Sequence, residues 1–143
     1  MRAIICLPTR NEEASVARMV QDIRAAGYEV FLSDQQSTDG TLAIAASLGV
    51  AVHQREGHGK GWGVRKALEV AAAGGVDVLV LIDCDCTYLP EDIPRLLAAM
   101  GACGCAIGCR PMRDIAWPNR LVNYLHTGAV NLLYGARLRD INS

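Results

Sequence analysis

Two carboxylates one residue apart, Asp83 and Asp85, follow the apolar run 78–82. A buried strand that ends at two acids presents fixed negative charge at the carboxyl edge of a sheet, where open α/β folds bind their ligands. Carboxylates in such a place commonly hold Mg²⁺, which takes one or two of them together with the phosphates of a substrate. The motif therefore indicates a metal and diphosphate site, although a solvated turn with incidental acids fits these residues equally well.

A second candidate for chemistry is the glycine-rich run 57–63, with Lys60 at its centre. Its glycines would let the backbone approach an anion, and the lysine would supply positive charge. A Walker A motif needs Ser or Thr directly after Gly-Lys, and Gly61 stands there, which argues against a P-loop NTPase. The run 8–13 contains no glycine, so a dinucleotide-binding G-x-G-x-x-G is missing as well. A cationic anion-binding loop or a plain strand-to-helix turn remains.

Apolar runs and amphipathic stretches that would position these residues alternate along the whole chain. We expect strands at residues 3–7, 30–33, 51–53, 78–82 and 105–109. We expect helices at residues 13–26, 38–48, 62–73, 90–100 and 117–134, most of them followed by glycine. This order predicts an α/β fold with a mostly parallel sheet and helices on both faces, in which the segments after the strands meet at one edge.

Composition narrows the class of protein. The chain has 143 residues, of which 51% are hydrophobic and 20% charged, as in a folded single domain. No apolar stretch reaches the roughly 20 residues of a membrane helix, and the start leads directly into a strand rather than a signal sequence, so we expect a cytoplasmic protein. The net charge of −1 argues against nucleic acid as a partner. No feature of the sequence sets an oligomeric state.

The part of the chain after Ile93 carries an excess of positive charge, unlike the chain as a whole, with six arginines against two acidic residues. Such an excess suits a local anionic partner or a solvated helix face. Six cysteines are also present, and without an export signal we expect free thiols. Zinc is disfavoured because the C-x-C spacings differ from those of common structural zinc sites.

Taken in chain order, four segments resemble the family 2 glycosyltransferases, which have the nucleotide-sugar-binding GT-A fold. Residues 8–13, Pro-Thr-Arg-Asn-Glu-Glu, resemble the opening P-x-Y-N-E-E, and residues 34–41 resemble D-D-G-S-T-D-G-T. Residues 59–61 are similar to G-K-G, and residues 83–85 match D-x-D. The resemblance covers essentially the whole chain and implies a GT-A type fold. Because the family pattern continues past Ser143, we expect that fold to be shortened at its C-terminal end.

A narrower resemblance concerns residues 108–110, Arg120, Asn131 and 140–143. These are similar to markers of the branch that includes dolichyl-phosphate mannose synthase and other polyprenyl-phosphate glycosyltransferases. The branch implies a metal-dependent, inverting transfer of a hexose from a UDP- or GDP-sugar to a polyprenyl phosphate, by an enzyme peripheral to the cytoplasmic membrane face. In a single domain, residues 1–109 would form the donor half and residues 110–143 the start of the acceptor half.

The resemblance also implies roles for individual residues. Asp83 and Asp85 would act in catalysis by binding Mg²⁺ or Mn²⁺. The residues implied in binding the nucleotide and donor are Pro8, Arg10, Asn11, Glu12, Asp34, Lys60 and Cys84. Arg110 and Arg120 would hold the acceptor phosphate, which is already an anion, and Asp140 would serve as base if the acceptor were a sugar hydroxyl.

Several residues depart from the family pattern. Arg10 stands in place of a tyrosine, Gln35 and Gln36 in place of Asp and Gly, and Thr87 in place of a frequent Gln. Arg10 can reach a phosphate but would not stack on a base as tyrosine does. The alternatives are a nucleotide-sugar-binding domain without transfer activity and a family 2 transferase with a sugar hydroxyl acceptor. A nucleotidyltransferase is disfavoured, because it would carry a glycine- and arginine-rich loop after the first strand.

Overall fold

The computed structural model describes residues 1–101, 103–108 and 117–138. The chain divides into two compact units, Met1–Ile93 and Pro94–Ser143. The predicted boundary between a donor half and an acceptor half, after residue 109, concerns function, and it stays a prediction. Each unit is described by itself below.

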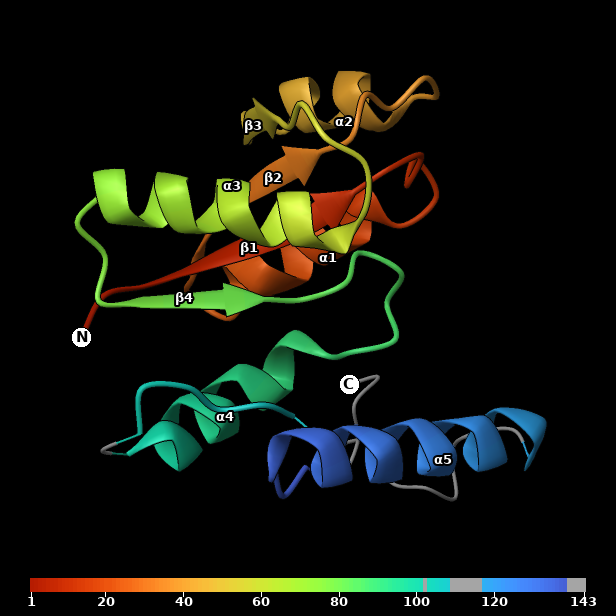
Figure 1. Ribbon diagram of the computed structural model, residues 1–143. Coiled ribbons are helices and arrows are strands. Elements are labelled where there is room, and N and C mark those ends of the chain that lie inside the picture. Colours follow the sequence, from red (N-terminus) through yellow and green to blue (C-terminus); the bar gives the residue numbers. More distant parts are fainter. Residues whose placement is uncertain (102, 109–116, 139–143) are drawn as a thin grey trace. The chain divides into compact units, whose positions relative to one another are not determined.

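The first unit is built around a four-stranded parallel sheet in the order β3-β2-β1-β4 (Figure 1). Its strands are β1 (Ala3–Thr9), β2 (Glu29–Asp34), β3 (Ala51–Gln54) and β4 (Val78–Leu81). The helices of this unit are α1 (Val16–Ala25), α2 (Thr41–Ser47), α3 (Lys60–Ala73) and the short 3₁₀ helix η1 (Pro90–Asp92). The predicted parallel α/β sheet is confirmed, and each of these strands lies where an apolar run predicts one.

Helices cover both faces of the sheet. Helix α3 crosses one face, in contact with β1, β2 and β4, while α1 packs on the other face and also contacts α2 (Figure 1). Consecutive β1 residues Ile5, Cys6 and Leu7 are therefore all fully buried, as expected for a strand covered on both sides. On α3 the small residues Gly63, Ala67 and Ala71 form the buried stripe, so this helix packs close to the strands.

The strand order creates a switch point beside β1. The chain leaves β1 toward β2 and β3 on one side, then returns through α3 to β4 on the other side. Loops at the carboxyl ends of β1 and β4 consequently diverge and leave a crevice, the place where open parallel sheets bind ligands. The sheet thus brings the N-E-E and D-x-D segments to the same edge.

The remaining helices are α4 (Ile93–Met100), which begins at the last residue of the first unit, and α5 (Trp117–Tyr134). The predicted bounds of α5 are confirmed. The prediction of a strand at 105–109 is wrong for its described part, since residues 105–108 form no strand. That segment has only Ile107 as a large apolar side chain, and it is exposed. None of the helices in the described ranges is long and apolar enough to cross a bilayer.

Candidate functional site

A cavity of about 250 Å³ lies at the carboxyl edge of the sheet, inside the first unit. It is formed by residues from the ends of β1 and β3, the start of α3 and the segment after β4. Its lining consists of Pro8, Thr9, Arg10, Glu12, Arg55, Lys60, Asp83, Cys84 and Asp85. Seven of the residues predicted from the sequence therefore meet around one hollow, together with Thr9 and Arg55. The lining holds three cationic and three acidic side chains.

The two aspartates of the D-x-D segment have different surroundings. Asp83 Oδ2 lies 3.0 Å from Lys60 Nζ and forms an ion pair with it. Asp85 is more exposed, and its Oδ1 accepts a hydrogen bond from the Thr87 N–H at 2.9 Å. Partial burial tends to raise the pKa of Asp85, but hydrogen bonds from Thr87 and the charge of Lys60 outweigh it and leave that pKa below its ordinary value. Asp85 is thus an ionised oxygen donor at neutral pH.

Cys84, between these aspartates, is directed to the interior and is only 2% exposed. Its Sγ lies 4.0 Å from Ser15 Oγ on the segment that leads into α1. Burial raises the pKa of the Cys84 thiol to about 12, so the group stays protonated at neutral pH. A protonated thiol is a poor metal ligand. These surroundings argue against Cys84 as a metal ligand, while its predicted contact with the donor stays a prediction. The five cysteines in the described ranges are free thiols.

Besides Thr9, which ends β1, sequence reasoning missed Arg55. It follows β3 directly, is buried, and donates to Gly59 O at 3.2 Å and to Gln35 Oε1 at 2.6 Å. Its Nε is buried without a hydrogen-bond partner in the described part of the chain. Burial lowers the pKa of Arg55, the charge of Asp34 opposes this, and nearby Arg10 lowers it further. The available signal was position, since an arginine at the end of a parallel strand lies on the ligand edge.

Asn11 and its neighbours join the loops after β1 and β2. Asn11 adopts a positive φ of 58°, its N–H donates to Ser37 Oγ at 2.9 Å, and its Oδ1 accepts from the Thr38 N–H at 2.9 Å. Two residues on, Glu13 Oε2 accepts from the Gly40 N–H at 2.7 Å. Asn11 does not line the cavity, so its predicted contact with the donor stays a prediction. In this structure it shapes the loop that carries Arg10 and Glu12.

Asp34 ends β2 and is fully buried behind the cavity rather than in its lining. Its carboxylate accepts hydrogen bonds from the Thr9 hydroxyl at 3.0 Å, the Ser37 N–H at 2.9 Å and the Gln54 amide at 3.2 Å, and also from the Ser37 hydroxyl. These donors come from β1, β3 and the loop after β2, so Asp34 ties three chain segments together. Its predicted contact with base or ribose stays a prediction.

The predicted acceptor residues belong to the second unit. Arg120 lies in the first turns of α5, whereas Arg110 and Asp140 are outside the described residues. Asn131 is on the same helix, and its side-chain amide makes two hydrogen bonds of 2.9 Å with the backbone of Leu138. This pair of bonds holds residues 135–138 against the end of α5, ahead of the D-I-N-S segment.

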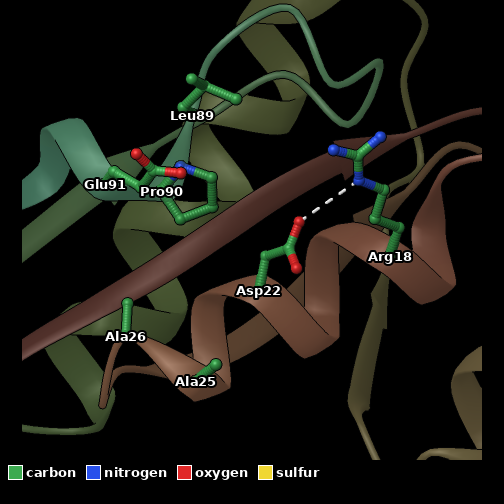
Figure 2. Close-up of a pocket in the computed structure, with 7 residues that line it drawn as sticks. All are labelled: Arg18, Asp22, Ala25, Ala26, Leu89, Pro90 and Glu91. Atoms are coloured by element: carbon green, nitrogen blue, oxygen red, sulfur yellow. Dashed lines mark ion pairs between the residues drawn. The ribbon is translucent and has the colours of Figure 1, made fainter.

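A second hollow, of about 290 Å³, lies between α1 and the segment at η1. Figure 2 shows Arg18 paired with Asp22 along α1, at 3.4 Å, with Leu89, Pro90 and Glu91 across from them. It shares no lining residue with the cavity at the strand ends. None of the residues predicted for chemistry lines it, so the strand-end cavity is the candidate site.

Comparison with known proteins places this geometry in context. The low-salt glycan biosynthesis hexosyltransferase Agl6 of Haloferax volcanii is 33% identical over 97% of this chain and 36% of its own length. The undecaprenyl-phosphate mannosyltransferase of Micrococcus luteus is 28% identical over 100% of this chain and 64% of its own length. The chain thus spans less than two thirds of the length of either relative.

Among solved structures, glucosyl-3-phosphoglycerate synthase from Mycobacterium tuberculosis, in complex with Mn²⁺ and UDP-glucose, matches with a TM-score of 0.62. The match has 25% sequence identity and covers 90% of this chain and 52% of that one. The fold is therefore of the GT-A type, as the resemblance implied. The model of the family described as glycosyl transferase family 2 matches residues 4–141, which is nearly the whole chain. With its D-x-D segment at the switch point of a parallel sheet and a family match over almost its full length, this chain belongs to glycosyl transferase family 2.

Proposed function

We propose that this chain is the catalytic domain, or the donor-side part of it, of an enzyme that transfers a hexose from a UDP- or GDP-sugar to a polyprenyl phosphate. The observation that carries the proposal is the cavity in which Asp83 and Asp85 face the cations Arg10, Arg55 and Lys60. A sugar nucleotide brings a diphosphate, which needs both a metal ligand set and positive charge. The names of the hexosyltransferase and mannosyltransferase relatives support the reaction class.

Asp83 and Asp85 would hold Mg²⁺ or Mn²⁺. The fit is chemical: both are carboxylates, the hard oxygen donors that these ions prefer, and the buried thiol between them is protonated. Two carboxylates leave room for the oxygens of a diphosphate to complete the coordination. When bound, the ion would stabilise negative charge on the departing nucleoside diphosphate. The Mn²⁺ in the matching synthase structure supports a divalent ion without deciding between the two.

The donor would lie along the lining from β1 to α3. Arg10 and Arg55 are close enough for one positive charge to lower the pKa of the other, so an anion placed between them is stabilised by both. The buried Arg55 Nε offers a donor that no described residue uses. Pro8 and Glu12 would contact the nucleotide, and Asn11 and Asp34 would keep their loops in position. The resemblance implies inversion at the anomeric carbon.

A polyprenyl phosphate needs no general base, because it is already an anion at neutral pH. Arg110 and Arg120 would position it, which places acceptor binding in the part of the chain after residue 109. This assignment implies that the protein acts at the membrane surface as a peripheral protein. A sugar hydroxyl acceptor, with Asp140 as base, and a domain that only binds the donor remain the two alternatives.

Calorimetric titration with UDP, GDP and their common sugars, with and without Mn²⁺, tests the donor site. We expect binding that requires metal and that is lost in Asp85→Ala, while Asp22→Ala on α1, the control, binds as wild type. Binding that survives both metal removal and Asp85→Ala would show that the site assignment is wrong. Transfer of labelled hexose to undecaprenyl phosphate then separates the enzyme from the binding domain, which would bind nucleotide without turnover.

A further inference from the structure

The ion pair between Lys60 and Asp83 joins two parts of the site that are both expected to contact the donor. Lys60 is the first residue of α3 and Asp83 follows β4, so the contact spans the crevice edge rather than one local turn. The side chain of Lys60 is 85% exposed, which means that packing does not hold it there. Its charge also acts on Asp85. The ammonium group therefore lies where it neutralises the carboxylate pair.

A metal ion bound to the Asp83 carboxylate would weaken the ion pair between that carboxylate and the Lys60 ammonium group. Mg²⁺ binds a carboxylate oxygen at about 2.0–2.1 Å, and a divalent ion so placed would repel an ammonium group 3.0 Å from the same oxygen. Because Lys60 has a long and exposed stem, it can leave at little cost. The other charged groups at the cavity are Arg10, Arg55, Glu12 and Asp85, and none of them is paired with Asp83 in the described part of the chain.

We propose that Lys60 occupies the cation position at Asp83 in the free protein, and that the divalent ion displaces it onto the donor diphosphate. The inference rests on the proposed function, since it assumes the metal at Asp83 and Asp85. Lys60 is then a positioning residue with two opposite effects. It weakens binding of the metal alone, and it strengthens binding of the metal with the nucleotide.

The backbone of the loop supports such an exchange. Gly59 has φ +95°, a conformation that favours glycine, and its carbonyl accepts from the buried Arg55. The start of α3 is thereby tethered to the cavity wall while the Lys60 side chain stays free to move. Only the ammonium group has to change partner, so no rearrangement of the loop is required.

The test is titration of Mn²⁺ into the protein without nucleotide, followed by titration of UDP and GDP at saturating Mn²⁺. For Lys60→Met we expect Mn²⁺ alone to bind about threefold more tightly, the size of effect that an exposed ion pair carries. Nucleotide binding at saturating Mn²⁺ should weaken by about fivefold or more, because the displaced charge is missing. Lys60→Arg should stay close to wild type in both titrations, as it keeps the charge.

Lys66→Met is the matched control, since Lys66 is on the same helix but pairs with Glu69 at 2.8 Å. It should leave both affinities unchanged. The inference is wrong if Lys60→Met binds Mn²⁺ no more tightly than wild type, or if it binds nucleotide equally well at saturating Mn²⁺. In either case, metal binding that depends on Asp85 would still support the proposed function. If wild type binds no Mn²⁺ with or without nucleotide, the proposed metal site fails and the inference fails with it.

Discussion

The Glu13 carboxylate accepts a hydrogen bond from the Gly40 N–H at 2.7 Å, across the two loops that follow β1 and β2. A Cβ added to Gly40 would lie 2.9 Å from Glu13 Oε2, too close for that bond to persist unchanged. Gly40 has φ −71°, so its backbone conformation is open to any residue. A side chain at position 40 is therefore opposed by the neighbouring Glu13 carboxylate, which would have to shift, and not by the backbone conformation.

This relationship predicts a coupling between Glu13→Ala and Gly40→Ala. Each change alone should lower the free energy of unfolding by about 1 kcal/mol, through loss of one charge-assisted hydrogen bond or through the close contact. Together they should cost less than their sum, because without Glu13 the alanine at 40 meets no carboxylate. Urea unfolding of the four proteins measures the coupling, with Glu91→Ala as a surface control. Strictly additive effects would contradict the contact.

Asp34 offers a second test, of a residue that the family resemblance assigns to the donor. Since its buried carboxylate accepts from Thr9, Ser37 and Gln54, Asp34→Ala takes this acceptor from one buried donor, the Thr9 hydroxyl, and from the partly buried bonds of Ser37 and Gln54. We expect the free energy of unfolding to fall by about 3 kcal/mol. Asp22→Ala, which removes an exposed i,i+4 partner of Arg18, should cost about 0.5 kcal/mol or less. Unchanged stability in Asp34→Ala would contradict a stabilising role for these hydrogen bonds.

Much of the fold follows from local pattern. In β1 and β2 apolar residues follow one another because both faces of the sheet are covered. Five of the described helices are followed by a glycine with positive φ, at 27, 49, 75, 101 and 135. The strand predicted at 105–109 shows the limit, since a short apolar run carries no information about a hydrogen-bonded neighbour. Residues 105–108 do not form a strand with the backbone hydrogen bonds of a sheet.

The site was predictable where a motif falls at a strand end, as at Asp83 and Asp85. What local pattern could not give is which polar groups pair across the sheet. Arg55 stands alone in the sequence, and besides Gly59 of its own loop it is held by Gln35, which belongs to the loop after β2. Conversely, Asn11 and Asp34 stand in motifs that suggest ligand contact, while their hydrogen bonds are made to the protein itself. To predict such long-range hydrogen-bond partners, one must know the topology of the sheet.

Asn131 should stabilise the chain just after α5. Asn131→Ala removes both 2.9 Å hydrogen bonds to Leu138, one as donor and one as acceptor. We expect a local loss of about 1 kcal/mol, seen as faster amide hydrogen exchange at Leu138 with little change in the first unit. Asn119→Ala, in the first turn of the same helix, is the control. Equal exchange rates at Leu138 in wild type and Asn131→Ala would contradict the pairing.

The raised pKa of the Cys84 thiol predicts how the free energy of unfolding changes with pH in the alkaline range. Burial raises the pKa of this thiol from the ordinary value of 9.0 to about 12. Below the lower value both the folded and the unfolded protein keep the proton, so the thiol has no effect there. Between the two values only the unfolded state loses its proton, so the free energy of unfolding falls as pH rises, by up to about 1.4 kcal/mol per pH unit.

Cys84→Ser removes this contribution, so its free energy of unfolding should fall less steeply than that of wild type from about pH 9 upward. Cys6, with its pKa also raised to about 12 by burial, contributes equally to both proteins and cancels in the comparison. Urea unfolding at a series of pH values measures the two slopes, and Cys103→Ser, at an exposed thiol, should follow wild type. Parallel curves for Cys84→Ser and wild type would mean that the Cys84 thiol ionises as readily in the folded protein as in the unfolded one, which would contradict the effect of its burial.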